Sequence, residues 1–151
     1  MTTPGDLTAV LARESRALVQ RLRLWTPSRW AAAAPVPGTR ADVAHHLAQA
    51  LADAAADQEG QPRRPLPRLD SDLALPDQLA VTADDLVRTA LPEPLARDAV
   101  LHVLLHRHHL LGDDVPAGLA HALGETAPLS AAGRFCAALG REDPAHGPLQ
   151  G

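Results

Sequence analysis

Residues 101–113, LHVLLHRHHLLGD, place four histidines within eight positions, in a run whose other residues are mostly leucine and valine. Because leucine and valine cover most of the circumference of a helix built from this stretch, we expect it to run through the middle of a helical protein and to end at Gly112. Buried imidazoles need partners, since an unsatisfied polar group inside a protein costs about 1 to 3 kcal/mol. Two interpretations follow: the histidines hold a metal ion, or Asp side chains and backbone carbonyls satisfy them.

Helical spacing places three of these four imidazoles on one face. At about 100° per residue, His102 and His106 lie one turn apart. His109 falls close to the direction of His102, whereas His108 points away. A His-x-x-x-His pair can direct two ring nitrogens to one divalent ion, although two histidines four residues apart also occur often by chance.

Apolar periodicity predicts four long helices and two short ones near the C-terminus. The long helices cover about residues 6–25, 40–57, 77–91 and 94–111, and the short ones lie within 117–124 and 130–141. Thr39 is the expected N-cap of the second long helix. The proline-rich segment 58–76 forms a long crossover, either a lid over the site or a strap. These features predict an all-α fold in one domain, residues 1–151: a four-helix bundle with short extra C-terminal helices.

The second long helix offers a third nitrogen ligand. In AHHLA, residues 44–48, His46 stands at the margin of the apolar stripe, while His45 points to the wetter side and is expected at the surface. His46, His102 and His106 would leave at least one coordination position open, which is typical of a catalytic rather than a structural metal site. Three nitrogen ligands suit Zn first, and also Ni, Fe or Mn.

Composition excludes several classes of function. The formal net charge of -4 and the absence of a strong basic cluster argue against a nucleic-acid partner. No apolar stretch reaches the roughly 18 to 20 residues that cross a bilayer, and no signal peptide is recognisable. The single cysteine, Cys136, cannot form an internal disulfide and is expected to be a packing thiol. We therefore expect a soluble cytoplasmic protein, with Ala- and Leu-rich helices that could supply a homodimer face.

Glu14 and two C-terminal histidines lie outside the main histidine run. Glu14 falls inside the apolar stripe of the first helix, so it either reaches past the stripe to solvent or an Arg, or supports a metal ligand as a buried carboxylate. His121 and His146, in the C-terminal part, are expected to be solvent residues.

Two separate motifs resemble the DinB/YfiT-like metalloenzyme superfamily. Residues 24–48, LWTPSRWAAAAPVPGTRADVAHHLA, resemble its start, and above all the N-terminal domain of mycothiol-dependent maleylpyruvate isomerase and its actinobacterial relatives. The matching residues are Trp30, Pro37, Gly38, Asp42, His46 and Leu47. Residues 102–112, HVLLHRHHLLG, resemble the second signature, with His102 and His106 at the ligand positions. The likeness covers residues 7–112.

Three departures from the family pattern stand out. His102 replaces the Glu usual in the isomerase branch, and His109 replaces an Asp after the last ligand. The Trp that usually follows the Pro-Gly pair is absent.

The resemblance implies a metal-dependent enzyme that uses a low-molecular-weight thiol such as mycothiol as cosubstrate. The metal would hold the thiol as thiolate for attack on an electrophilic small molecule. His109, Arg107 and Asp42 are expected to lie behind the ligands, and the sequence identifies no general base. The alternative is a non-catalytic helical-bundle binding protein that keeps the fold and uses its histidines structurally.

Overall fold

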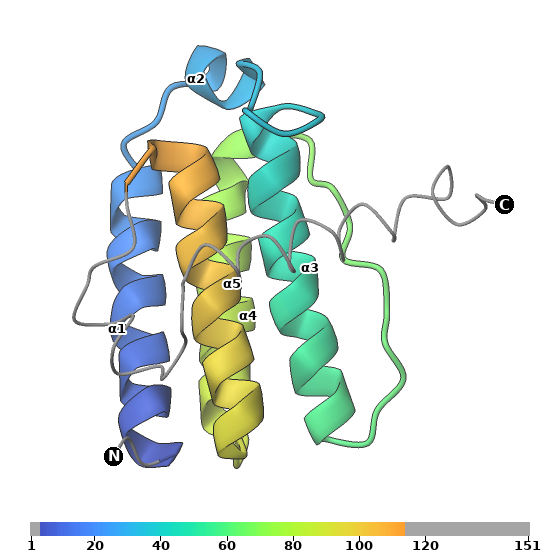
Figure 1. The fold of residues 1–151 in the computed structure, drawn as a ribbon. Helices are drawn as coiled ribbons and strands as arrows, with labels where there is room; N and C mark the ends of the chain where they lie inside the picture. The colour runs from blue at the N-terminus through green and yellow to red at the C-terminus, as the bar shows by residue number, and fades with distance from the viewer. Residues whose placement is uncertain (1–3, 114–151) are drawn as a thin grey trace, which may run out of the picture.

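Helices make up most of the part of the chain that the computed structural model describes, residues 4–113, with side chains from Leu7 onward (Figure 1). The helices are α1 Pro4–Leu22, α2 Pro27–Ala31, α3 Arg40–Gln58, the 3-10 turn η1 Asp72–Ala74, α4 Leu75–Arg88 and α5 Glu93–Leu111. Within these residues the only strand-like pairing is an isolated bridge between Ala33 and Thr39. The expectation of an all-α fold is confirmed for the described residues. The predicted C-terminal helices, Cys136, His121 and His146 lie outside them.

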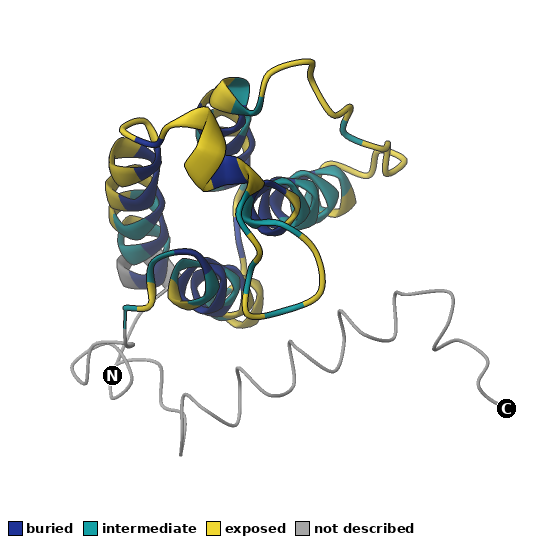
Figure 2. Ribbon diagram, turned by 90° about the horizontal axis from the view of Figure 1, so that it is seen from above, coloured by how far each residue is buried: buried dark blue, intermediate teal, exposed yellow. Residues whose placement is uncertain are grey.

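The four long helices lie side by side around a common core. In Figure 1, α1 and α5 run upward, whereas α3 and α4 run downward, and the short α2 lies across the top. Helices α1 and α3 each pack against both α4 and α5. Seen from above, the buried residues face the centre of this four-sided arrangement (Figure 2). The largest fully buried side chains are Trp30, Leu7, Leu11, Leu18, Leu22, Leu47, Leu51, Leu79, Leu86, Leu104 and His106.

Local sequence signals set where α3 begins and where α5 ends, the two helices that carry the histidines. Thr39 caps α3 as expected: its hydroxyl accepts from the Asp42 backbone N–H, and the Asp42 carboxylate accepts from the Thr39 N–H. Gly38 precedes the cap with φ of 109°, a conformation that favours glycine. Gly112 ends α5 in the left-handed conformation, also as expected.

Helices α1 and α4 differ from the periodicity at both ends: α1 begins at Pro4 rather than near Asp6, and α4 ends at Arg88 rather than near Leu91. Helix α1 ends at Leu22 rather than near Trp25, because the Trp25 ring packs on Trp30 of α2 with ring centres 4.7 Å apart. Helix α4 begins at Leu75 rather than Asp77, because Pro76 is tolerated in the first turn of a helix. Apolar spacing alone does not detect either effect.

The proline-rich crossover is a strap along α3 rather than a free loop. Gln49 accepts a hydrogen bond from the Leu66 N–H at 2.6 Å and donates to the Arg64 carbonyl at 3.0 Å. His45 Nε2 lies 2.8 Å from the Leu66 carbonyl oxygen, so that side of α3 is covered and His45 is part-buried rather than a plain surface residue. Arg68 anchors the far end by donating to Asp42 at 2.7 Å.

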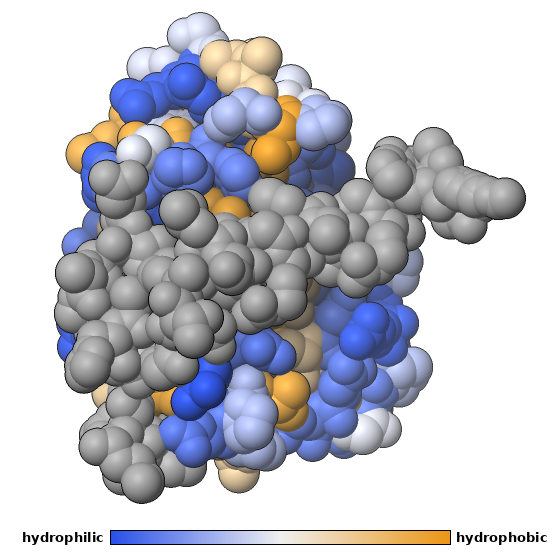
Figure 3. Space-filling view, viewed as in Figure 1, coloured by the Kyte–Doolittle hydropathy of each residue, from blue (hydrophilic) through white to orange (hydrophobic). Residues whose placement is uncertain are grey.

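The face of the molecule in Figure 3 carries both polar and apolar side chains. Hydrophilic residues dominate the coloured part of the face in Figure 3, with apolar side chains scattered between them. Within the described residues, every helix is too short or too polar to cross a bilayer.

Candidate functional site

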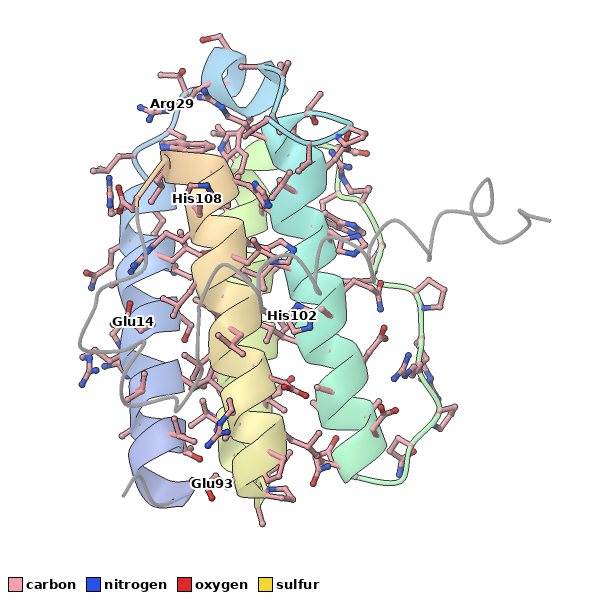
Figure 4. All side chains as sticks on the ribbon, in the orientation of Figure 1. Glu14, Arg29, Glu93, His102 and His108 are labelled. Atoms are coloured by element: carbon pink, nitrogen blue, oxygen red, sulfur yellow. The ribbon has the colours of Figure 1, made fainter. Side chains whose placement is uncertain are left out.

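Three histidines that are far apart in sequence come together between α3 and α5. His46 lies in the second turn of α3, and His102 and His106 occupy successive turns of α5. The ring centre of His106 is 6.0 Å from that of His46 and 5.9 Å from that of His102. Figure 4 labels His102, whose side chain points from α5 toward α3. These are the three residues that the sequence predicts as metal ligands.

His106 is the central member of this histidine cluster, which we define as His46, His102 and His106. Its side chain is only 1% exposed, and its Nδ1 lies 2.6 Å from the backbone carbonyl oxygen of His102. Because a carbonyl only accepts, Nδ1 carries the proton and Nε2 of the neutral ring keeps its lone pair. Nε2 is buried and has no hydrogen-bond partner among the described residues.

Burial keeps two members of the cluster, His102 and His106, uncharged. Burial, together with smaller contributions from the neighbouring histidines, lowers the pKa of His106 to about 3, although the hydrogen bond to the His102 carbonyl acts in the opposite direction. Burial likewise lowers the pKa of His102 to about 4, with a smaller contribution from the charge of His46. Neutral imidazole is the form that binds metal ions, so His102 and His106 are in the right protonation state at neutral pH.

A cleft leads from solvent to His102. It encloses about 240 Å³ between α3 and α5, and Leu51, Leu91 and Ala99 form apolar parts of its wall. Its polar wall holds Asp53, Asp98 and the ion pair in which Arg63 donates to Asp57 at 2.7 Å. A small molecule in this cleft would lie against His102, the one cluster histidine in its wall.

The carboxylates of this cleft were not predicted, although the sequence carries a signal for them. Asp98 precedes His102 by four residues on α5, and Asp53 follows His46 by seven on α3. Both spacings place a carboxylate on the helix face that carries a cluster histidine.

Three neutral imidazoles are suitable ligands for a divalent ion, but the rings of His46, His102 and His106 stand too far apart to bind one ion in their present positions. Two imidazoles bound to one ion at about 2.1 Å in a tetrahedral arrangement have ring centres about 5 Å apart. The two measured separations are longer, and the rings of His46 and His106 are nearly parallel, at 15°. In residues 4–113, no three His, Cys, Asp or Glu side chains stand close enough together to hold an ion. Side-chain rotation of His46 and His102 toward His106 Nε2 would be needed to form the site.

Two of the three residues expected behind the ligands are engaged elsewhere. Arg107 donates to the Glu14 carboxylate at 2.7 Å and so joins α5 to α1. This pair confirms that Glu14 reaches an arginine. The Asp42 carboxylate accepts from Thr39 and Arg68, and these hydrogen bonds hold its pKa below the usual range.

His109 is the third of these residues and lies near the cluster. Its charge helps to lower the pKa of His106, and burial, followed by the neighbouring His108, lowers the pKa of His109 itself. His108 points outward, as its helical direction predicts, and is exposed. Of the three residues expected behind the ligands, His109 is the one whose charge acts on a cluster histidine, and its role in supporting the ligands stays a prediction.

Comparisons with models of protein families, with curated proteins and with solved structures find no match to this chain.

Proposed function

We propose that this protein is a divalent-metal-dependent thiol transferase or isomerase with a four-helix bundle of DinB/YfiT-like type. His46, His102 and His106 hold the metal ion, with Zn first and Ni, Fe or Mn as alternatives. The observation that carries the proposal is the buried Nε2 of His106. This neutral nitrogen has a free lone pair and lacks a hydrogen-bond partner among the described residues, and the centre of its ring lies 6.0 and 5.9 Å from the centres of two further imidazoles. A divalent metal ion is a ligand that His106 Nε2 could share with the two neighbouring imidazoles.

The metal ion, the thiol, the cleft and His106 each have a separate role in the proposed reaction. A bound divalent ion lowers the pKa of a thiol that coordinates it and so supplies a thiolate at neutral pH. Three histidine ligands leave a position for this thiol, a low-molecular-weight cosubstrate of the mycothiol type. The cleft beside His102 holds the electrophilic small molecule, its apolar wall excluding water and its carboxylates orienting polar substituents. The hydrogen bond from His106 Nδ1 to the His102 carbonyl fixes which nitrogen faces the ion.

Metal analysis of the purified full-length protein tests the site. We expect about one equivalent of divalent ion in the wild type, and a loss of at least about 10-fold in affinity in each of His46→Ala, His102→Ala and His106→Ala. His108→Ala is the matched control, because it removes an exposed imidazole from the same helix. Retention of a stoichiometric ion by all three cluster variants, or a wild type that takes up none from a metal-supplemented buffer, contradicts the proposal.

A second candidate function is a non-catalytic bundle that binds a partner or small molecule. It is favoured by the separation of the rings: no three possible ligands stand close enough together to hold an ion in the described part of the chain. A conjugation assay with mycothiol and a panel of electrophiles separates the two candidates. Turnover that disappears with chelator and returns with Zn supports the enzyme, whereas metal binding without any turnover supports the binding protein.

A further inference from the structure

A second concave surface lies between α1 and α4, on the side of the bundle away from the histidine cluster. This groove encloses about 400 Å³. Its apolar lining consists of Ala12, Val19, Ala80, Val81, Ala83 and Val87. Val81 is 59% exposed at its edge, and Ser15 in its floor already donates its hydroxyl to the Leu11 carbonyl at 2.7 Å. The groove is therefore an apolar surface whose one buried hydroxyl is satisfied.

The two walls of the groove carry opposite charges. Arg16 and Arg23 lie on the α1 wall, whereas Asp84 lies on the α4 wall and Asp77 beside it in the first turn of α4. Arg23 donates to Asp77 at 3.1 Å, which sets the C-terminal end of α1 against the N-terminal end of α4. Arg16 precedes Arg23 by seven residues and Asp84 follows Asp77 by seven, a rise of about 10.5 Å along each helix. Because α1 and α4 are antiparallel, Arg16 and Asp84 stand at the same height along the bundle.

Such a surface is complementary to a rotated copy of itself. A two-fold rotation about an axis parallel to the helices exchanges the α1 and α4 walls and preserves height. Arg16 of one copy then meets Asp84 of the other, and the same contact occurs twice. A partner of a single charge would match one wall and be repelled by the other.

We propose that this groove is the interface of a homodimer in which α4 of each copy lies in the groove of the other. Val81 of each copy fills the apolar groove of its mate, and two Arg16–Asp84 pairs flank this contact. The exposed i,i+4 pair of Asp84 with Arg88, at 2.8 Å, is easily exchanged because such surface pairs contribute little to stability. This interface does not depend on the metal proposal.

Charge reversal at Arg16 or Asp84 tests whether this groove is the dimer interface. Light scattering after size exclusion, at about 10 to 100 µM, is expected to give twice the chain mass of 15.9 kDa for the wild type. Arg16→Asp places aspartate opposite aspartate at both contacts, and Asp84→Arg places arginine opposite arginine. Each variant alone is expected to raise the dissociation constant by at least about 100-fold.

Mixing these two variants is the decisive measurement. The aspartate introduced into the first chain would meet the arginine introduced into the second, and the native Asp84 of the first would meet the native Arg16 of the second. A heterodimer therefore forms where neither homodimer does. The double variant R16D/D84R is expected to recover the dimer by the same pairing.

The matched control is D85R, a reversal on α4 beside the groove, which should leave the dimer intact. Circular dichroism confirms that each variant is folded. A monomeric wild type, a dimer that survives both reversals, or a mixture that stays monomeric overturns the proposal.

Discussion

His106 donates its Nδ1 proton to the backbone carbonyl of His102 at 2.6 Å, and this contact determines the character of the whole cluster. It turns the lone pair of Nε2 toward the protein interior, where no hydrogen-bond donor of the described residues meets it. A buried unsatisfied nitrogen lowers stability. A neutral buried nitrogen in a ring that neighbours two further imidazoles is a suitable first ligand for a metal ion.

His106→Leu is expected to stabilise the metal-free protein while abolishing metal binding. The substitution removes the unsatisfied Nε2, and the His102 carbonyl keeps its helical hydrogen bond, so the free energy of unfolding in chelator should rise by about 1 kcal/mol. His108→Leu, on the exposed side of α5, should change it by no more than about 0.5 kcal/mol. Urea unfolding measures both. A loss of more than about 2 kcal/mol in His106→Leu would show that Nε2 is already satisfied.

Mild acid is expected to destabilise the chelated protein through His102 and His106. Both have a folded pKa, about 4 and about 3, below the unfolded value of 6.5, so the unfolded chain binds more protons below pH 6.5. Stability is therefore full above pH 6.5 and falls as the pH falls toward these values, by about 1.4 kcal/mol per pH unit for each histidine. Unfolding between about pH 5 and 6.5 should have a clearly shallower pH slope in His106→Leu. Equal slopes would contradict the assignment.

The Glu14–Arg107 pair is expected to behave as a buried ion pair. Both side chains are little exposed, at 13% and 12%. Removing Glu14 therefore leaves the Arg107 charge uncompensated between α1 and α5, and removing Arg107 leaves Glu14 only the exposed Arg13 at 3.7 Å. Glu14→Leu and Arg107→Leu should each cost about 3 kcal/mol, and the double variant should recover most of this loss. Arg97→Ala, which breaks the more exposed pair with Glu93, is the control, with a change within about 0.5 kcal/mol. Additive losses in the double variant would rule out this interpretation.

Gly38→Ala is expected to damage the start of α3. A Cβ at this position would lie 2.8 Å from the Asp42 carboxylate, and the φ of 109° disfavours any side chain. The expected cost is about 1 to 3 kcal/mol, with loss of the capping box. Gly60→Ala is the matched control, because φ there is also positive but nothing lies within 4 Å of the new atom. Thermal unfolding should rank Gly38→Ala as the more destabilised of the two.

Gln49→Ala is expected to release the strap without unfolding the bundle. The glutamine side chain holds the Leu66 N–H and the Arg64 carbonyl, and the variant retains the contacts of His45 and Arg68. Limited trypsin digestion should cut after Arg63 and Arg68 about 10-fold faster, because cleavage follows local opening.

Glu93→Ala is the control for this experiment, because it breaks an ion pair with Arg97 within α5 and leaves the contacts of Gln49, His45 and Arg68 with the strap in place. Unchanged cleavage in Gln49→Ala would mean that the strap is held elsewhere.

Several parts of the fold were predictable because they depend on neighbours in sequence. Thr39 begins α3 and Gly112 ends α5 as their local chemistry dictates. The outward direction of His108 and the burial of His106 follow from helical geometry and the surrounding leucines. The early end of α1 could not be predicted in this way, because it depends on how Trp25 packs against Trp30 of another helix.

The histidine cluster and its surroundings likewise contain features that the sequence predicts and features that it does not. His46 was predicted at the edge of an apolar stripe, and it lies beside His106. The partners of Arg107 and Asp42 were not predictable, because Glu14 is 93 residues away in the chain and Arg68 lies 26 residues away across the crossover. The acidic cleft also needs both α3 and α5 in place before it exists.

The amino-acid sequence by itself determined the helical class, the ends of the histidine-bearing helices and the face of α5 that carries His102 and His106. Those features arise from hydrogen bonds and side-chain directions within a few residues of the chain. Tertiary structure alone decided which helix faces which: the approach of His46 to His106, the strap on α3, the ion pair between α1 and α5 and the groove between α1 and α4. These features depend on how the helices rotate against one another to bury their apolar faces, and that is a property of the whole core.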